Sequence, residues 1–332
     1  MATVLFTLQC TAAPSCSAGS AILMDGDTGA VLYEKNADAQ SLIASTTKIM
    51  TAVVVLEHCD PESVYVIPAE ATGIEGSSLY LKEGEELTIC ELLYGLMLHS
   101  GNDAAVALAL ACSDSVPEFV SLMNLKAQEL ELHDTHFENP SGLDGQQHYS
   151  SARDLAKLTR FALNIPAFRE IVSTKSICIG ERRLTNHNKL LWSLDGAIGV
   201  KTGYTRAAGR ILVSAAERNG RRLIAVTIND GNDWKDHESL YTFGFGQYEE
   251  RSLLTVGSET VCIPLLSGGT ARLLAGEDFS FFVRDEENVN VRLLYPKLAF
   301  ETGPEGSFAG YGVVYLGEKQ IGRIQLLWGG RP

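Results

Sequence analysis

Three short motifs, each present only once, constrain this chain more than any other feature of its sequence. They are Ser45-Thr46-Thr47-Lys48, Ser100-Gly101-Asn102 and Lys201-Thr202-Gly203. Together they supply a hydroxyl nucleophile, two amines and a side-chain amide, and acyl transfer through a serine needs groups of these kinds. The sequence therefore predicts a fold that brings three distant segments to one site.

The bulk composition indicates a globular protein of one or two domains. The chain has 332 residues, of which 45% are hydrophobic and 20% are charged. Its formal net charge is −14. Nucleic acids and anionic membrane surfaces attract clustered Lys and Arg, so neither is expected as the main partner of this acidic chain.

Hydrophobic spacing predicts a helical insertion between β segments. Ile49, Val53 and Leu56 recur at helical spacing, and the helix that carries them is apolar nearly all round, so it should be central. Apolar runs on both sides of residues 26–29 predict a hairpin. The expected helices span residues 46–58, 89–99, 103–112, 117–132, 151–163 and 236–246, and the expected strands span 20–25, 30–34, 197–203, 209–217 and 222–229.

After residue 250 the sequence changes to short β-type runs separated by Gly, Pro and acidic turns, which predicts a small all-β domain. We therefore expect a leader or signal remnant over residues 1–18, a catalytic domain over 19–250 and a β-rich C-terminal domain over 251–332. The leader assignment depends on a mildly apolar start followed by small residues, although the first basic residue is Lys35. The expected C-terminal strands span 259–264, 279–283, 289–295, 312–316 and 320–327.

The seven cysteines show neither a C-x-x-C pair nor the spacing of zinc ligands, so no metal site is expected. Their odd number excludes complete pairing within the chain. Cys59, Cys90 and Cys112 lie in apolar helical stretches, where a free cysteine behaves as a small hydrophobic residue. These three are expected as buried free thiols.

Ser45 and Lys48 are spaced i, i+3 at the start of a predicted helix and therefore share one face. A serine needs a base to become a nucleophile at neutral pH, and a lysine can be that base only if its pKa falls. Burial, the positive end of the helix dipole and a second amine, Lys201, would each lower the pKa of Lys48.

The other two motifs offer groups for proton transfer and substrate binding. Ser100 and Asn102 interrupt two apolar helices, either as an ordinary turn or as a proton relay and a substrate-binding amide. Lys201 and Thr202 could bind a terminal carboxylate, whereas Gly203 lets its strand approach another element closely. An exposed strand edge at this position could pair with an extended peptide.

The combination of S-x-x-K, S-x-N and K-T-G resembles the pattern of penicillin-binding proteins and class A β-lactamases. In particular, the chain resembles the low-molecular-mass penicillin-binding proteins, which are serine-type D-Ala-D-Ala carboxypeptidases of peptidase family S11, and among them the DacF-like branch. The resemblance covers residues 20–250 well and 251–332 loosely. The further stretches that carry it are residues 43–51, 100–105, 139–144, 185–191 and 199–205.

The resemblance implies an α/β (α+β) fold of the serine β-lactamase/DD-peptidase kind, in which an antiparallel sheet is flanked by helices and carries a helical insertion. It also implies removal of the terminal D-Ala from peptidoglycan stem peptides. Ser45 would attack the carbonyl of the penultimate D-Ala, with Lys48 and Ser100 as the other catalytic residues. The backbone N–H groups of Ser45 and Tyr204 would hold the oxyanion. The substrate-binding residues would be Asn102, Lys201, Thr202, Gly203 and Tyr204.

The resemblance also implies where the enzyme acts and what inhibits it. β-Lactam antibiotics would acylate Ser45, and no metal or cofactor is implied. The enzyme would be exported, to the outer face of the cytoplasmic membrane or the cell wall, with its proximity to the membrane left open.

One position departs from the family pattern. In several relatives an arginine beyond the K-T-G strand helps to bind the substrate carboxylate, and the corresponding place here is near Asp233. The sequence leaves open which group replaces that arginine. The candidates are Thr202, Lys201, Thr205, Arg206 and Arg210.

Three alternatives to a carboxypeptidase remain. A β-lactamase would share the motifs, but the class A enzymes need a glutamate in an E-x-x-L-N loop and no such string occurs here. A DD-transpeptidase or endopeptidase would use the same site with a different acceptor or substrate. A non-catalytic cell-wall-binding protein would keep the fold without the reaction.

Overall fold

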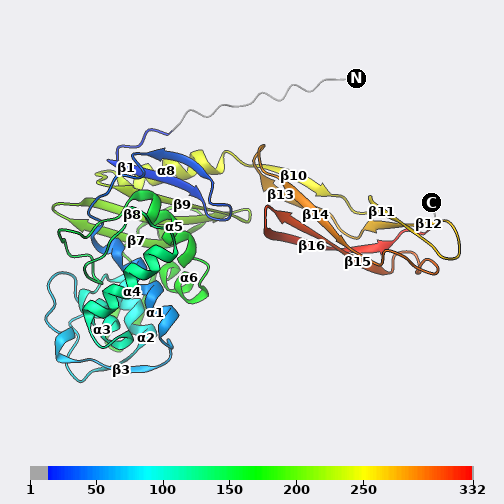
Figure 1. Ribbon diagram of the computed structural model, residues 1–332. Helices are drawn as coiled ribbons and strands as arrows, with labels where there is room; N and C mark the ends of the chain where they lie inside the picture. Colours follow the sequence, from blue (N-terminus) through cyan, green and yellow to red (C-terminus); the bar gives the residue numbers. More distant parts are fainter. Residues whose placement is uncertain (1–13, 331–332) are drawn as a thin grey trace. The chain divides into compact units, whose positions relative to one another are not determined.

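The computed structural model describes residues 14–330 (Figure 1). The chain divides into two compact units, one ending at Phe245 and the other beginning at Gly246. Most of the expected leader, residues 1–18, lies outside the described residues. The sequence predicted a boundary between the catalytic and β-rich domains at residue 250, and these domain assignments stay a prediction.

The first unit is built on a five-stranded antiparallel sheet with the strand order β2-β1-β9-β8-β7. The hairpin predicted near the start of the chain forms β1 and β2, and the three strands predicted near residues 197–229 form β7, β8 and β9. The antiparallel sheet of the sequence-based fold class is confirmed. The strands are β1 (Ser20–Asp25), β2 (Val31–Lys35), β7 (Ala197–Thr205), β8 (Gly209–Arg218) and β9 (Arg221–Ile228).

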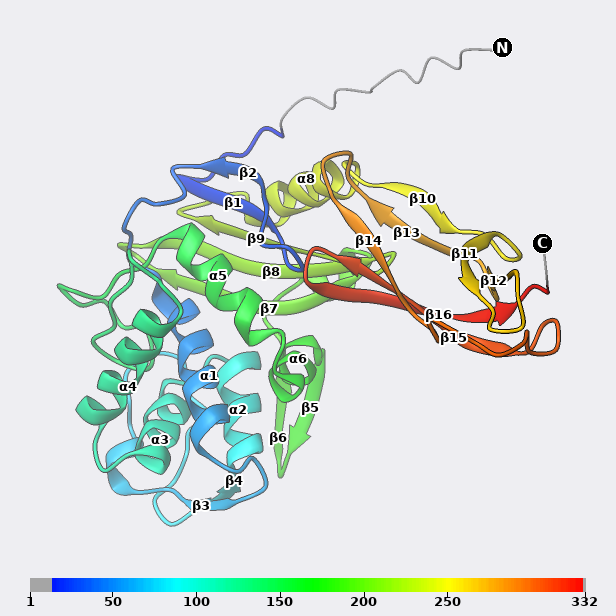
Figure 2. The same ribbon diagram turned by 45° about the vertical axis from the view of Figure 1, so that its right-hand side comes forward.

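Helices cover both faces of this sheet. Ile22 on β1 belongs to the large hydrophobic core shared with the helical insertion, whereas the next residue, Leu23, faces Gly244 of α8 (Asp233–Phe245). Because successive strand residues point to opposite faces, α8 lies on the other side of the sheet from that core. The helix α5 (Ala152–Ala162) crosses the core side, packed against β1 and β9 (Figure 2). All six residues of β1 are accordingly buried.

The helical insertion between β2 and β7 contains the elements that carry two of the three motifs. Its central helix, α1, begins directly after the 3₁₀ turn η1, and eight of its eleven residues are buried. The helix α2 begins with a capping box in which Thr88 and Glu91 satisfy each other's backbone N–H groups. The insertion comprises η1 (Ala44–Thr47), α1 (Lys48–His58), β3 (Val64–Val66), η2 (Ala69–Ala71), β4 (Glu86–Thr88), α2 (Ile89–Leu98), α3 (Asn102–Cys112), α4 (Val116–Glu129), α5, α6 (Pro166–Ser173), β5 (Ser176–Ile179), β6 (Arg182–Thr185) and α7 (Leu190–Ser193).

Among the residues that the structure describes, no single helix is both long and apolar enough to cross a membrane. Only α3 and α4 taken together pass such a test, and they are bent by 87°.

The cysteines of the insertion correct one sequence-based expectation. Cys59 and Cys112, predicted as free buried thiols, form a disulfide with a Cα–Cα distance of 6.2 Å. The two residues follow α1 and end α3, and packing of these helices brings them together. Cys90 is free and partly buried against the core, as a small hydrophobic residue would be.

The second unit is composed of β-strands, as the sequence predicted. A sheet with the order β11-β12-β16-β15-β14 carries a small hydrophobic core of its own, which includes Leu273, Ile324 and Leu326. A separate pair joins β10 to β13. The strands are β10 (Glu249–Leu254), β11 (Glu259–Pro264), β12 (Thr270–Ala275), β13 (Phe279–Val283), β14 (Val289–Leu294), β15 (Phe308–Leu316) and β16 (Lys319–Trp328).

Candidate active site

Ser45 and Lys48 meet at the junction of η1 and α1. The Lys48 ammonium is 3.1 Å from the Ser45 hydroxyl oxygen, which is hydrogen-bonding distance. The tight turn at this junction has a positive φ at Ala44. Gly142 packs against this turn so closely that a side chain at position 142 would overlap the Ala44 carbonyl oxygen. The backbone thus fixes the serine at the start of the central helix.

The surroundings of Lys48 favour its neutral, basic form. The side chain is fully buried, and its Nζ also donates to the Asn102 side-chain oxygen at 2.7 Å and to the Ser141 carbonyl at 2.5 Å. Burial and the charge of Lys201 hold the pKa of Lys48 well below its usual value, although Asp103 acts in the opposite direction. An amine of lowered pKa beside a serine hydroxyl can accept that hydroxyl's proton.

The K-T-G motif lies on β7 and closes the site from the opposite side. Lys201 is buried, and burial lowers its pKa to about 7. A Cβ atom placed on Gly203 would lie 3.3 Å from the Ser45 backbone nitrogen. Since any larger side chain at Gly203 would need more room than this, the strand can approach the serine closely only with glycine there.

A pocket of about 500 Å³ opens in front of these groups. At least one residue of each motif lines it, so the structure brings the three motifs together. Lys48, Asn102 and Lys201 are buried side chains that do not themselves line it. The residues of the motifs and of β7–β8 that line the pocket include Ser45, Ser100, Thr202, Gly203, Tyr204 and Arg210.

The S-x-N motif forms the break between α2 and α3 that the sequence predicted. Ser100 has a φ of 65°, a conformation rare for residues other than glycine, and its buried hydroxyl has no hydrogen-bond partner within residues 14–330. Asn102 accepts from Lys48, and its amide nitrogen donates to the Glu75 carbonyl at 2.6 Å. In this structure Asn102 therefore positions Lys48, and the predicted contact with substrate is not tested.

Two groups at the site were missed by the sequence reasoning. The Ser141 carbonyl contacts Lys48, and the only sequence signal for it was the turn chemistry of residues 139–144. Asp103 is completely buried and accepts hydrogen bonds from the backbone N–H groups of Leu79 and Leu81 and from the hydroxyl of Ser78. It thereby fixes the loop before β4 against the start of α3.

The departure from the family pattern has a structural counterpart in an Arg210–Asp233 pair. Arg210 pairs with Tyr204 across β8 and β7, and its guanidinium donates to both carboxylate oxygens of Asp233 at 2.8–3.0 Å. The side chain of Arg210 is 44% exposed, whereas that of Asp233 is 4% exposed. Of the candidates for carboxylate binding, Thr202 and Arg210 line the pocket, whereas the Thr205 hydroxyl donates to Asp144.

Comparison with known proteins decides the family. The sequence pattern of the D-alanyl-D-alanine carboxypeptidase family, peptidase family S11, matches residues 7–232. The chain belongs to this family. It is 35% identical over 289 residues to the D-alanyl-D-alanine carboxypeptidase DacF of Bacillus subtilis, covering 82% of this chain and 74% of that protein. It is 37% identical to DacA of Escherichia coli K12, covering 80% of this chain and 70% of that protein.

Solved structures agree with this family assignment. Penicillin-binding protein 5 of Haemophilus influenzae superposes with a TM-score of 0.69 at 30% identity, covering 97% of this chain and 99% of that chain. A mutant of the DD-transpeptidase of Streptomyces K15 superposes with a TM-score of 0.68 at 34% identity and covers 70% of this chain. All of that transpeptidase chain is matched. The predicted DD-peptidase fold class is therefore confirmed.

Proposed function

We propose that this chain is a serine D-Ala-D-Ala carboxypeptidase that removes the terminal D-Ala from peptidoglycan stem peptides. The observation that carries the proposal is the contact of a buried, low-pKa lysine, Lys48, with the Ser45 hydroxyl at the wall of an open pocket. Membership in the S11 family supports the reaction class, and the curated relatives DacF and DacA are named for it.

In the proposed reaction, Lys48 takes the Ser45 proton as the oxygen attacks the carbonyl of the penultimate D-Ala. The oxyanion is held by the backbone N–H groups of Ser45 and Tyr204, which the close approach of Gly203 to Ser45 supports. Ser100, whose hydroxyl is buried in the pocket wall, relays the proton that Lys48 accepted to the leaving amine of D-Ala. Water then hydrolyses the ester, and Ser45 regains its proton.

Arg210 is proposed as the group that binds the terminal carboxylate of the substrate. A guanidinium can bind a carboxylate through two parallel hydrogen bonds, and Arg210 lines the same pocket as Ser45 and Thr202. Asp233 accepts hydrogen bonds from the guanidinium and lines the same pocket, and the Trp234 ring lies 5.7 Å from the guanidinium. Lys201 is fully buried and donates to the Thr202 carbonyl, so in this proposal it tunes Lys48 rather than binding the carboxylate directly.

The remaining sequence-based predictions are part of the same proposal. Residues 1–18 are a leader or signal remnant, residues 19–250 the catalytic domain and residues 251–332 a separate β-rich domain. The enzyme is exported and works at the outer face of the cytoplasmic membrane or in the cell wall. Its partners are stem peptides ending in D-Ala-D-Ala and β-lactams, which acylate Ser45.

The test is incubation of the purified chain with a tripeptide ending in D-Ala-D-Ala, followed by assay of free D-alanine. We expect release that penicillin blocks, and covalent labelling by a fluorescent penicillin that Ser45→Ala abolishes without loss of folding. Labelling that persists in folded Ser45→Ala protein would show that another residue is the nucleophile.

The same assay separates the alternatives. Transfer to an added amine in preference to water indicates a transpeptidase, the activity named for the Streptomyces K15 protein. Rapid nitrocefin turnover beyond one equivalent indicates a β-lactamase. If a folded protein shows no D-alanine release and no labelling, the chain is a non-catalytic wall-binding protein.

A further inference from the structure

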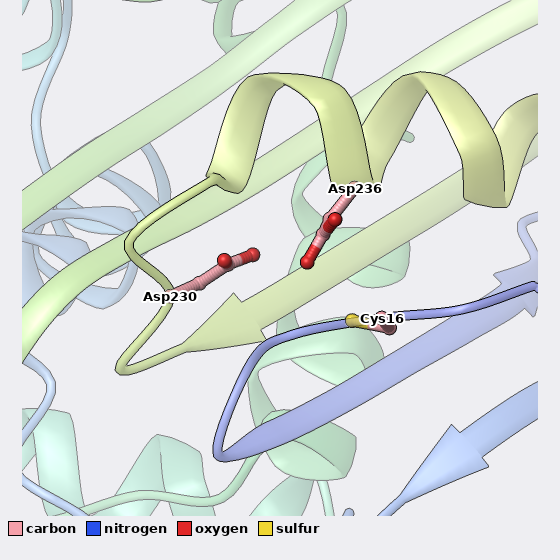
Figure 3. A group of neighbouring side chains, drawn as sticks. All are labelled: Cys16, Asp230 and Asp236. Carbon is pink, nitrogen blue, oxygen red and sulfur yellow. The ribbon is translucent and has the colours of Figure 1, made fainter.

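A second cluster of reactive side chains lies outside the active-site pocket. Cys16 precedes β1, Asp230 follows β9 and Asp236 lies in the first turn of α8. One ligand atom from each residue lies within 4.8 Å of the others. Figure 3 shows the two carboxylates pointing toward each other, with Cys16 beside them on the segment that leads to β1.

The two carboxylates are buried without a cation. Asp230 is 1% exposed and Asp236 is 5% exposed, and neither forms a salt bridge with any residue in the described part of the chain. Two buried negative charges at this separation repel each other and lack the solvation that water would give. A proton shared between the carboxylates or a bound cation would relieve this cost.

One buried oxygen of the cluster is open to either a proton or a cation. Asp230 Oδ1 accepts hydrogen bonds from the Asn232 backbone N–H and from the Ser17 hydroxyl. Asp230 Oδ2 is buried and accepts no hydrogen bond from the described residues. On Asp236, Oδ2 accepts both the backbone N–H and the hydroxyl of Ser17. The cluster therefore contains an unused buried acceptor next to a thiol.

We propose that Cys16, Asp230 and Asp236 form a binding site for one divalent zinc-like cation in the chain that retains residues 14–18, a segment that cleavage of the proposed leader would remove. A thiolate with two carboxylate oxygens suits Zn²⁺, which takes sulfur and oxygen ligands in tetrahedral sites. Mg²⁺ and Ca²⁺ prefer sets of six or more oxygens, and a site with one sulfur and two carboxylates does not supply them. The fourth position of such a tetrahedron is left to water.

The proton balance of binding makes the affinity depend on pH. When the cation binds, the thiol releases one proton to solvent and the sulfur bonds to the metal. Affinity should accordingly increase as the pH rises.

The position of the cluster suggests what the cation does. It would join the segment before β1 to the loop between β9 and α8, which are more than 200 residues apart in the chain and are joined here by the Ser17–Asp236 hydrogen bonds. Asp230 and Asp236 also bracket Asp233, the partner of Arg210. A bound cation would thus hold the loop that positions Arg210.

Titration with Co²⁺, an optical substitute for Zn²⁺, tests the site in the complete chain with its Cys59–Cys112 disulfide intact and Cys16 as a free thiol. We expect one equivalent to give a near-ultraviolet thiolate-to-cobalt band that Zn²⁺ displaces, and Zn²⁺ to raise the Tm. Cys16→Ser should abolish the band, whereas Cys178→Ser, which removes an exposed free thiol on β5, should leave it unchanged. Asp230→Asn removes a charged ligand and should weaken binding by more than the roughly 10- to 100-fold that loss of an outer-shell partner costs.

Either of two results would overturn the proposal. One is the absence of a band and of any Tm change with metal in folded wild-type protein, which would leave a proton shared by the two carboxylates. The other is a band that survives in Cys16→Ser. The readouts are optical and thermal, so they do not depend on whether the proposed peptidase activity is correct.

Discussion

Replacement of Arg210 by glutamine tests the proposed recognition of the substrate carboxylate. Hydrogen bonds to charged groups contribute about 1.5–3 kcal/mol, and Arg210 is partly exposed and already shared with Asp233, so a loss of about 1.5–2 kcal/mol is expected. Because about 1.4 kcal/mol corresponds to a factor of ten, kcat/KM for a D-Ala-D-Ala peptide should fall roughly 10- to 30-fold.

The decisive assay compares two substrates that differ only at the C-terminus. One ends in the free carboxylate of D-Ala-D-Ala and the other in the corresponding carboxamide. The wild-type enzyme should prefer the carboxylate, and Arg210→Gln should reduce that preference because only the carboxylate substrate loses its partner. The acylation rate with penicillin, which also carries a carboxylate, should fall in parallel.

Asp233 provides the matched control. Arg210→Gln alone leaves a buried Asp233 carboxylate facing the substrate's negative charge, and like charges repel. The double variant Arg210→Gln/Asp233→Asn removes that repulsion and should recover part of the lost activity toward the carboxylate substrate. An equal loss for the carboxylate and carboxamide substrates, or no loss for either, would refute the assignment of Arg210.

Three further perturbations test the lysines and the disulfide. Asn102→Asp places a charged acceptor beside Lys48, raises its pKa and should shift the pH profile of penicillin acylation to higher pH; an unshifted profile would contradict this role of Asn102. Relative to Lys201→Met, the wild-type free energy of unfolding should rise between pH 7 and 10.5, because burial lowers the folded pKa of Lys201 to about 7 and the unfolded state then binds more protons. Parallel stability curves in urea unfolding would contradict it. Paired Cys59→Ser and Cys112→Ser substitutions should cost about 2–4 kcal/mol by the same measurement, whereas Cys178→Ser should cost little.

The main elements of the fold could be predicted because their signals are local. Helical apolar spacing marked α1, apolar or amphipathic helical runs marked α2, α3 and α5, and a leading proline followed by helix formers marked α4. Apolar runs marked β1, β2 and β7 to β9 within a few residues of their observed bounds. The elements that were missed include β10 and β12 of the second unit, although β12 lies inside its sheet and buries Ala271 and Leu273; the others are short or lie at the surface. They include the two-stranded pairs β3–β4 and β5–β6 and the helices α6 and α7, whose formation depends on packing against the larger elements.

The site was predictable only where a side chain carries the chemistry. Ser45, Lys48 and Lys201 could be named from their motifs, since their functional groups appear in the sequence. The Ser141 contact uses a backbone carbonyl, which every residue has, so no residue type marks it. The choice of Arg210 among five candidates depends on the register of β7 against β8, and the pairing of Cys59 with Cys112 depends on helix packing.

The different partners of two adjacent residues, Asn102 and Asp103, explain how the site lowers the pKa of Lys48. A buried ammonium needs hydrogen-bond acceptors, but a carboxylate acceptor would stabilise the charged form and raise its pKa. Lys48 receives neutral acceptors, the Asn102 amide oxygen and the Ser141 carbonyl. The neighbouring carboxylate, Asp103, is bound instead by the backbone N–H groups of Leu79 and Leu81. Because the loop N–H groups stabilise the Asp103 carboxylate, its effect on Lys48 is smaller than the combined effects of burial and of the Lys201 charge. The pKa of Lys48 therefore stays low.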